Sequence, residues 1–165
     1  MSFASLVLLF FFLPVVLVGY YRFPRRWRNP FLLAANLVFY GWGEPWFLPV
    51  ILLTALANWQ IGRLIARSAE PRVRRFWLGA ALVLDFGLLA VFKYTAFVLD
   101  SIGLGRLLAS PLPLPLGISF YTFQVVSYVV DVYRNSAPAE HRFVPFATYM
   151  TFFPQLIAGP IVRYD

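Results

Sequence analysis

The chain has 165 residues, of which 61% are hydrophobic and 13% are charged, about half the charged fraction of an ordinary soluble domain. A soluble domain of this length could not bury so much apolar surface, and the mean hydropathy of +0.72 leads to the same conclusion. The composition therefore predicts an integral membrane protein. It excludes a disordered chain and, because the sequence has no cysteine, a disulfide-stapled module or a thiolate metal site.

The basic residues, which give the chain a formal net charge of +7, gather in two tracts between long apolar runs. The tracts consist of Arg22, Arg25, Arg26 and Arg28, and of Arg63, Arg67, Arg72, Arg74 and Arg75. Such tracts are typical of cytoplasmic loops beside an anionic membrane leaflet. We therefore expect membrane lipid, and no nucleic acid, as a partner of the basic residues.

The first hydrophobic segment, Phe3–Tyr21, is long enough for a membrane-spanning helix and lacks the basic start and the cleavage site of a signal peptide. Pro14 inside it predicts a kink. After the first tract, which ends at Asn29-Pro30, helices are predicted over Phe31–Trp42 and Trp46–Ile65, with a Gly- and Pro-rich turn between them. The first of these two helices is short for a crossing unless it extends into its flanks or meets a thinned bilayer.

Three further hydrophobic segments follow the second tract. Phe76–Leu99 predicts a helix, and the alternating prolines before Pro115 predict an extended connection. The next helix is expected over Leu116–Tyr133. The last segment, Phe143–Ile161, is interrupted by Pro154 and by Gly159-Pro160, so it either spans the membrane or re-enters it.

These segments predict an all-α fold: a polytopic transmembrane helical bundle of about five to six hydrophobic segments, in one domain over residues 1–165, with the last segment either spanning or re-entrant. The first, third and fifth connections contain four, five and two arginines, whereas the second and fourth contain none and one. The positive-inside rule therefore predicts an amino terminus outside the cell, with Arg25 and Arg74 facing the cytoplasm and Glu44 facing outward.

Polar residues at membrane depth are candidates for function because they are unfavourable in lipid. Asp85 and Lys93 lie eight residues apart, hence about 80° apart around a helix, so they do not share a face. Gln124, Ser127, Asp131 and Arg134 are spaced by three, four and three residues and therefore form one stripe. Pairing with a neighbouring helix explains Asp85 and the stripe without a catalytic role; a polar tunnel wall is the alternative for the stripe.

The single histidine, His141, lies in a polar connection with no serine or cysteine nucleophile arranged beside it, so we expect a solvated loop residue. Asp131 and Arg134 are close enough along the helix to form an ion pair. The sequence contains none of the common phosphate-binding, serine hydrolase or zinc motifs. From the residues alone, no catalytic residue and no metal ligand are assigned.

Two long motifs change this assessment. Residues 114–124, LPLGISFYTFQ, continue through Ser127-Tyr128 to Asp131-Val132-Tyr133-Arg134, and residues 152–163 read FFPQLIAGPIVR. Together they resemble the membrane-bound O-acyltransferase (MBOAT) family, and most closely its bacterial alginate O-acetyltransferase type. The resemblance covers essentially the whole chain.

The resemblance implies a multi-pass enzyme of the bacterial cytoplasmic (inner) membrane that passes an acyl group, with acetyl expected, to hydroxyls of an exopolysaccharide such as alginate. It implies no bound cofactor, an acyl-thioester donor (acyl-CoA or carrier-bound) as co-substrate, and accessory acetylation proteins as partners. The tunnel would involve Gln124, Ser127, Asp131, Arg134, Gln155 and Arg163. The family's essential histidine belongs to a later Trp-His-Gly context, which His141 does not match. We therefore expect an amino-terminal fragment, without the carboxy-terminal catalytic part and inactive alone.

Two rival hypotheses stay open at this point. A transporter-like or structural polytopic membrane protein would also use a polar stripe and an acidic residue such as Asp85 along an ion or solute path. A genuinely short relative of the enzymes, acting as a scaffold subunit, would share the same motifs.

Overall fold

The computed structural model describes residues 7–101, 114–158 and 164, and every regular element among them is helical. The elements are η1 (a π-helical turn, Leu8–Phe12), α1 (Leu13–Arg22), α2 (Arg25–Gly43), η2 (a 3₁₀ turn, Pro45–Phe47), α3 (Leu48–Arg67), α4 (Pro71–Ser101), α5 (Ile118–Tyr133), α6 (Phe143–Met150) and α7 (Phe153–Ala158). The predicted all-α class is confirmed for this part of the chain.

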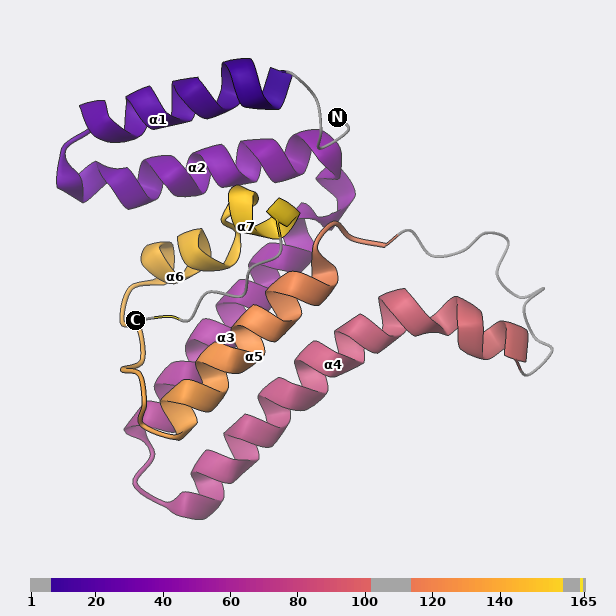
Figure 1. Cartoon of the computed structure of the whole chain (residues 1–165). Helices are drawn as coiled ribbons and strands as arrows, with labels where there is room; N and C mark the ends of the chain where they lie inside the picture. Colours follow the sequence, from indigo (N-terminus) through magenta and orange to yellow (C-terminus); the bar gives the residue numbers. More distant parts are fainter. Residues whose placement is uncertain (1–6, 102–113, 159–163, 165) are drawn as a thin grey trace.

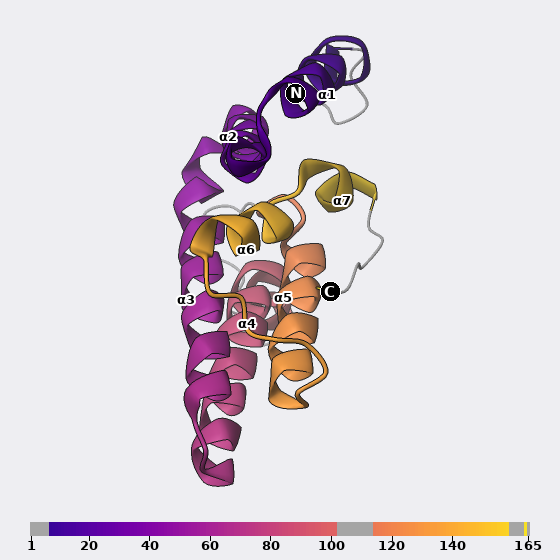
Figure 2. The same ribbon diagram turned by 90° about the vertical axis from the view of Figure 1, so that its left-hand side faces the viewer.

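The helices form two groups with a short pair between them (Figure 1). Helices α1 and α2 make an antiparallel hairpin, and α3, α4 and α5 pack against one another as a three-helix bundle. Seen from the side, α6 and α7 lie between the hairpin and the bundle (Figure 2), where α6 contacts both α2 and α3.

The hydrophobic core lies mainly where α3, α4 and α5 meet. Its fully buried side chains include Ile51, Ala55, Tyr121, Val125 and Tyr128. A second cluster joins the hairpin to α7 through Val16, Phe39 and Phe153. The outward faces of the helices are also apolar, with Phe10, Val83 and Phe97 at least 70% exposed. Apolar residues on both inner and outer faces are expected of helices that meet lipid.

Two helical stretches, Pro45–Arg67 and Pro71–Thr95, are long and apolar enough to cross a membrane. The predicted helix over Phe31–Trp42 extends into its flanks, because α2 runs from Arg25 to Gly43 and, at 19 residues, is about 29 Å long. The expectation of five to six hydrophobic membrane segments, beyond these two stretches, stays a prediction.

The arginine tracts are largely helical, where the sequence predicted loops. Pro24 is extended (ψ 152°) and α2 begins directly after it, so Pro30 lies inside the helix instead of ending the tract. The second tract is interrupted only at residues 68–70, because α4 begins at Pro71, a residue well suited to the first helical position. Arginine is a good helix former, so a tract flanked by apolar residues continues the neighbouring helix.

Helix α5 begins at Ile118, two residues later than predicted, because Gly117 has a left-handed backbone (φ +67°). A Cβ at Gly117 would lie 3.0 Å from Cδ2 of Leu156, so glycine is needed both for the backbone and for the approach of α7.

The predicted segment Phe143–Ile161 is divided into α6 and α7, with the break at residues 151–152, just before Pro154. With eight residues, α6 is about 12 Å long and cannot cross a bilayer alone, and the described part of α7 has six residues. Gly159-Pro160 lies outside the described residues. Pro14, at the start of α1, follows the π-helical turn η1, whose wider geometry is commonly found at helix irregularities.

Candidate functional site

The break between α6 and α7 is held by a buried glutamine pair. Gln124 of α5, 2% exposed, donates its Nε2 protons to the carbonyl oxygen of Tyr149 (3.0 Å) and to Oε1 of Gln155 (3.2 Å). The structure therefore brings together two of the predicted tunnel residues, Gln124 and Gln155, from helices that are far apart in sequence.

Asn36 of α2, fully buried, holds the same break from the other side. Its Nδ2 donates to the carbonyl oxygen of Thr148 (3.3 Å) and to Oγ1 of Thr151 (3.4 Å), and its Oδ1 accepts the N–H of Phe153 (3.4 Å). Lipid cannot satisfy the backbone groups that a helix break frees, so side-chain amides take that role here. Asn36 was not among the predicted site residues, although an asparagine inside an apolar segment was an available signal.

The other members of the predicted stripe do not reach this break. Ser127 donates to the carbonyl oxygen of Gln124 within its own helix (2.7 Å). Asp131 lies about 10 Å further along α5 and is half-buried, whereas Arg134 is exposed. Within the described residues no ion pair joins Asp131 to Arg134. Arg163 lies outside the described residues.

The start of α5 is fixed by residues from the end of α2. Glu44 accepts the backbone N–H of Leu116 at Oε2 (2.7 Å), and the hydroxyl of Tyr40 donates to the carbonyl oxygen of Leu116 (3.4 Å). Leu116 precedes the left-handed Gly117, so these contacts hold the turn at residues 115–118 against the α2–α3 connection. From the sequence, Glu44 was predicted only to face outward.

Asp85 pairs with a neighbouring helix, as predicted. Nδ2 of Asn58 on α3 donates to Oδ1 of Asp85 on α4 (2.8 Å), and both side chains are almost completely buried. Lys93 is exposed, with Nζ 3.5 Å from Oγ of Ser119, which agrees with a position at the membrane interface. This contact with α3 is the structural pairing that the sequence predicted for Asp85.

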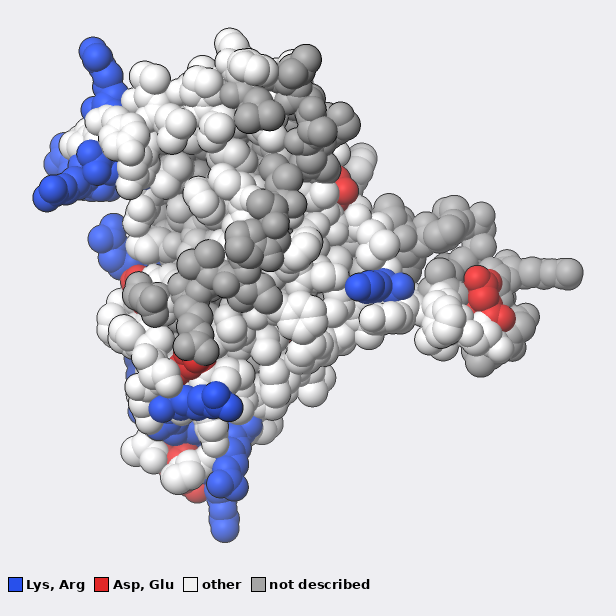
Figure 3. All heavy atoms as spheres, in the orientation of Figure 1, with Lys and Arg blue, Asp and Glu red and all other residues white. Residues whose placement is uncertain are grey.

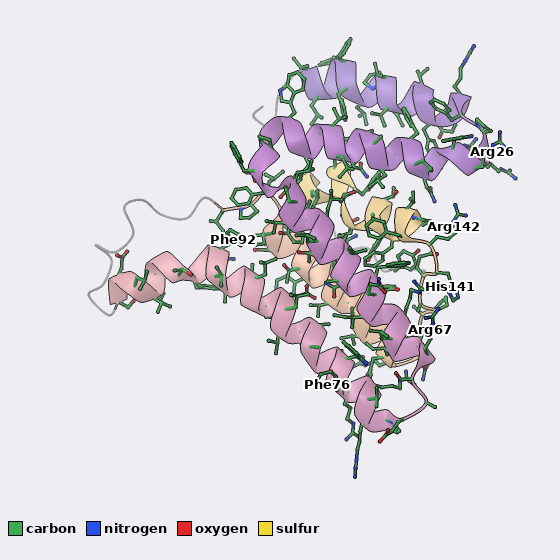
Figure 4. All side chains as sticks on the ribbon, turned by 180° about the vertical axis from the view of Figure 1, so that it is seen from behind. Arg26, Arg67, Phe76, Phe92, His141 and Arg142 are labelled. Carbon is green, nitrogen blue, oxygen red and sulfur yellow. The ribbon has the colours of Figure 1, made fainter. Side chains whose placement is uncertain are left out.

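Most of the basic side chains visible in Figure 3 lie along one edge of the molecule. Blue side chains in Figure 3 gather over the end of the hairpin where α1 connects to α2, and over the α3–α4 turn. In the reverse view, Arg26, Arg142, His141 and Arg67 follow one another along the same edge (Figure 4). Basic residues gathered on one edge of a membrane protein are typical of the side that faces the cytoplasm.

Some arginines of this edge have structural partners. Nη2 of Arg74 donates to the carbonyl oxygens of Tyr133 (2.6 Å) and Val132 (3.4 Å) and to Oδ1 of Asn135 (2.8 Å), so it caps the carboxyl end of α5. The guanidinium of Arg63 lies 4.6 Å from the ring centroid of Trp59. From the sequence, Arg74 was predicted only as a charged residue of a cytoplasmic loop.

His141 is exposed in the connection between α5 and α6, as predicted (Figure 4). Its neighbour Glu140 accepts a hydrogen bond from the hydroxyl of Tyr164 and one from the backbone N–H of Arg142 (2.8 Å). Burial raises the pKa of Glu140, but the hydrogen bonds outweigh burial and hold this pKa below its ordinary value. The ionised carboxylate therefore fastens Tyr164 to the α5–α6 connection.

The described residues around the α6–α7 break contain amides, hydroxyls and aromatic rings, with no nucleophile–base pair and no group of three potential metal ligands. An apolar groove of about 240 Å³ adjoins the break, lined by residues of α1 and α2 and by Phe152, Phe153 and Pro154. The arrangement can hold an irregular backbone and an apolar chain in place, but it offers no group for acid–base catalysis.

Comparison with known proteins gives clear relatives. The chain is 41% identical to the probable alginate O-acetylase AlgI of Pseudomonas aeruginosa, over 99% of this chain and 33% of that protein. AlgI of Azotobacter vinelandii is 40% identical over 99% of this chain and 34% of its own length. A peptidoglycan O-acetyltransferase of Helicobacter pylori is 30% identical over 95% of this chain and 36% of its own length.

No protein-family model matches the chain, and no solved structure matches it. The chain spans about a third of the length of the curated relatives that it matches. Along almost its whole length the chain is thus similar to one part of the alginate O-acetylases, and its predicted resemblance to O-acetyltransferases of this type is confirmed.

Proposed function

We propose that the chain is the amino-terminal part of a membrane-bound O-acyltransferase that transfers an acetyl group to hydroxyls of an exopolysaccharide such as alginate. The observation that carries this proposal is the 41% identity to a probable alginate O-acetylase over 99% of the chain. In the reaction, the acceptor hydroxyl forms the new C–O bond, the C–S bond of an acyl-thioester donor breaks, and the thiol leaves. The hydroxyl proton passes to a general base and then to the thiolate.

The general base belongs, in this proposal, to the two thirds of the relatives' length that this chain does not match. His141, the only histidine of the chain, is exposed on a connection and has no nucleophile beside it. The part of the protein described here contributes the frame: Gln124, Gln155 and Asn36 hold the broken α6–α7 segment in a fixed conformation. Irregular backbone of this kind is tolerated at membrane depth where it borders protein or a cavity.

We further propose that the protein lies in the bacterial inner membrane, with its basic edge in the cytoplasm and its amino terminus outside. The acyl-thioester donor (acyl-CoA or carrier-bound) would then approach the basic edge, and the polysaccharide and accessory acetylation proteins would complete the system. The arrangement of both arginine tracts along one edge supports this orientation (Figure 3).

Single cysteines test the orientation, since the native chain has none. Suitable positions are Trp46, which is 88% exposed in the α2–α3 connection, and the exposed Arg26 and Arg72 at the basic edge. An impermeant thiol reagent applied to intact cells is expected to label cysteine at position 46 and to spare positions 26 and 72. Labelling at 26 and 72, with position 46 protected, would overturn the orientation.

The function is tested by deleting the gene in its host and measuring O-acetyl groups on the secreted polysaccharide by NMR. Deletion is expected to abolish acetylation, and the full-length gene carrying His141→Ala is expected to restore it. An unchanged acetyl content after deletion would contradict the proposal. Unchanged acetylation together with a defect in solute uptake would favour the transporter-like alternative.

A further inference from the structure

The Asp85–Asn58 contact leaves two buried oxygen atoms unexplained. Asn58 uses both of its amide protons: Nδ2 donates to Oδ1 of Asp85 (2.8 Å) and to the carbonyl oxygen of Thr54 (3.1 Å). The remaining atoms of the pair, Oδ1 of Asn58 and Oδ2 of Asp85, are buried and have no hydrogen-bond partner among the described residues. Buried polar atoms of folded proteins are nearly always paired, so two such atoms on one pair need an explanation.

An ionised Asp85 cannot explain them. A carboxylate only accepts hydrogen bonds, and the amide oxygen of Asn58 is also an acceptor, so neither leftover atom could serve the other. The carboxylate would also carry its charge midway along α4, at 1% exposure, which is strongly unfavourable at membrane depth.

The neighbouring groups supply no compensating charge within the described part of the chain. On α5, the group that interacts electrostatically with Asp85 is the hydroxyl of Tyr121, which is neutral. On α3, the guanidinium of Arg63 stacks on the ring of Trp59. On α4 itself, Lys93 is exposed and about 80° away around the helix.

A bound cation is the alternative to a proton. Hard divalent cations take about six or more oxygen ligands. The site offers three unpaired oxygens, those of Asn58, Asp85 and Tyr121. A proton needs one acceptor only, and Oδ1 of Asn58 is a free acceptor on the side chain already bonded to Asp85.

We propose that Asp85 binds a proton in the folded protein and donates it from Oδ2 to Oδ1 of Asn58, which closes a reciprocal acid–amide pair between α3 and α4. The pair then has two hydrogen bonds in opposite directions and no net charge. It lets a carboxyl group lie inside the three-helix bundle and joins two helices that are both able to cross a membrane. This proton site is independent of the proposed acetyl transfer.

Infrared spectroscopy of the full-length protein in detergent at neutral pH tests the proposal. Asp85→Asn is the matched variant, because an amide at position 85 can donate to Oδ1 of Asn58 and accept from its Nδ2. The wild type minus Asp85→Asn difference spectrum is expected to show the C=O band of a protonated carboxylic acid. Asp131→Asn, a change at a half-buried position near the end of α5, is expected to leave that band in place.

A difference spectrum that shows the carboxylate bands of Asp85, with no carboxylic acid band, would overturn the proposal. Labelling the wild type with carboxyl-¹³C aspartate gives the same assignment without a substitution, so the test survives if Asp85→Asn does not fold. In the labelled wild type, absence of an isotope-shifted carboxylic acid band would likewise overturn it.

The pH dependence gives a second measurement. A folded state that binds one more proton than the unfolded state loses stability as pH rises, and its unfolding equilibrium constant increases up to about tenfold per pH unit. The wild type is therefore expected to lose stability relative to Asp85→Asn as pH rises from about 5, just above the ordinary carboxyl pKa, to neutral pH. Parallel pH profiles for the two proteins would contradict a protonated Asp85.

Discussion

Gly62 of α3 packs against Tyr128 of α5, and replacing it by alanine tests the packing of the bundle. A Cβ at this position would lie 2.9 Å from both Cε1 and the hydroxyl oxygen of Tyr128. The Tyr128 ring has little freedom to move, because it is fully buried and packs on Phe146 and Tyr164 at centroid distances of 4.8 and 5.3 Å. Its hydroxyl also accepts the N–H of Glu140 (3.0 Å).

The expected magnitude follows from three terms. Inside a helix, replacing glycine by alanine raises the free energy of unfolding by about 0.8–1.0 kcal/mol. Overpacking a buried site costs about 1–3 kcal/mol, and displacing the Tyr128 hydroxyl loses a hydrogen bond of about 1 kcal/mol. Gly62→Ala is therefore expected to lower the free energy of unfolding by about 1–3 kcal/mol.

Gly79→Ala is the matched control. Gly79 is also inside a helix, α4, but a Cβ there would meet nothing within 4 Å. This variant keeps the helical gain of up to about 1 kcal/mol and has no clash. Reversible unfolding of the full-length protein in mixed micelles should separate the two variants by about 2–4 kcal/mol. If Gly62→Ala is as stable as Gly79→Ala, the described contact between α3 and α5 is wrong.

Three further outcomes are expected. Arg74→Ala should lower the free energy of unfolding by about 1–3 kcal/mol, because the last carbonyls of α5 lose their donor, whereas Arg75→Ala, at an exposed site, should change it by less than about 0.5 kcal/mol. Asn36→Leu should reduce the amount of folded protein in membranes, measured by immunoblot, because the α6–α7 break loses its partners. The pKa of Glu140 is lowered in the folded state, so the stability that its carboxylate contributes is present above the ordinary carboxyl pKa and is lost as pH falls. The difference in free energy of unfolding between wild type and Tyr164→Phe should therefore shrink in acid. A difference that stays constant with pH would contradict this assignment.

Helix positions were predictable where hydropathy alone determines them. The predicted helices over Trp46–Ile65 and Leu116–Tyr133 agree with α3 and α5 within two residues at each end. Loops were predicted at the arginine tracts because a run of charged residues was interpreted as the end of a helix. Arginine has high helix propensity and an aliphatic stem, so both tracts continue their helices.

The contacts of the candidate site could not be derived from helical spacing. Asn36 bonds to Thr148, 112 residues away, and Gln124 bonds to Gln155. Spacing along one helix predicts which residues share a face, but not which helix packs against that face. The break itself was predictable from Pro154, although the partners that satisfy it were not.

The expected pairing of Asp131 with Arg134 shows a different limit. A three-residue spacing permits an ion pair on a helix, yet Arg134 is exposed at the end of α5, where water competes for the guanidinium. Arg74, from another helix, takes the capping role at that end instead. The spacing therefore indicated a contact that helix geometry permits, whereas the packing of the helices places Arg74 at this end of α5.

The central claim, that this chain is part of an enzyme that acetylates polysaccharide hydroxyls, is tested most directly by acetyl transfer in isolated membranes. Membranes containing the full-length protein and its accessory proteins are given an acetyl-thioester donor with ¹³C in the acetyl carbonyl, together with unacetylated alginate. The account predicts ¹³C-labelled O-acetyl esters on the polymer, absent when membranes lack the protein. Equal labelling with and without the protein, or hydrolysis of the donor with no ester on the polymer, would contradict it.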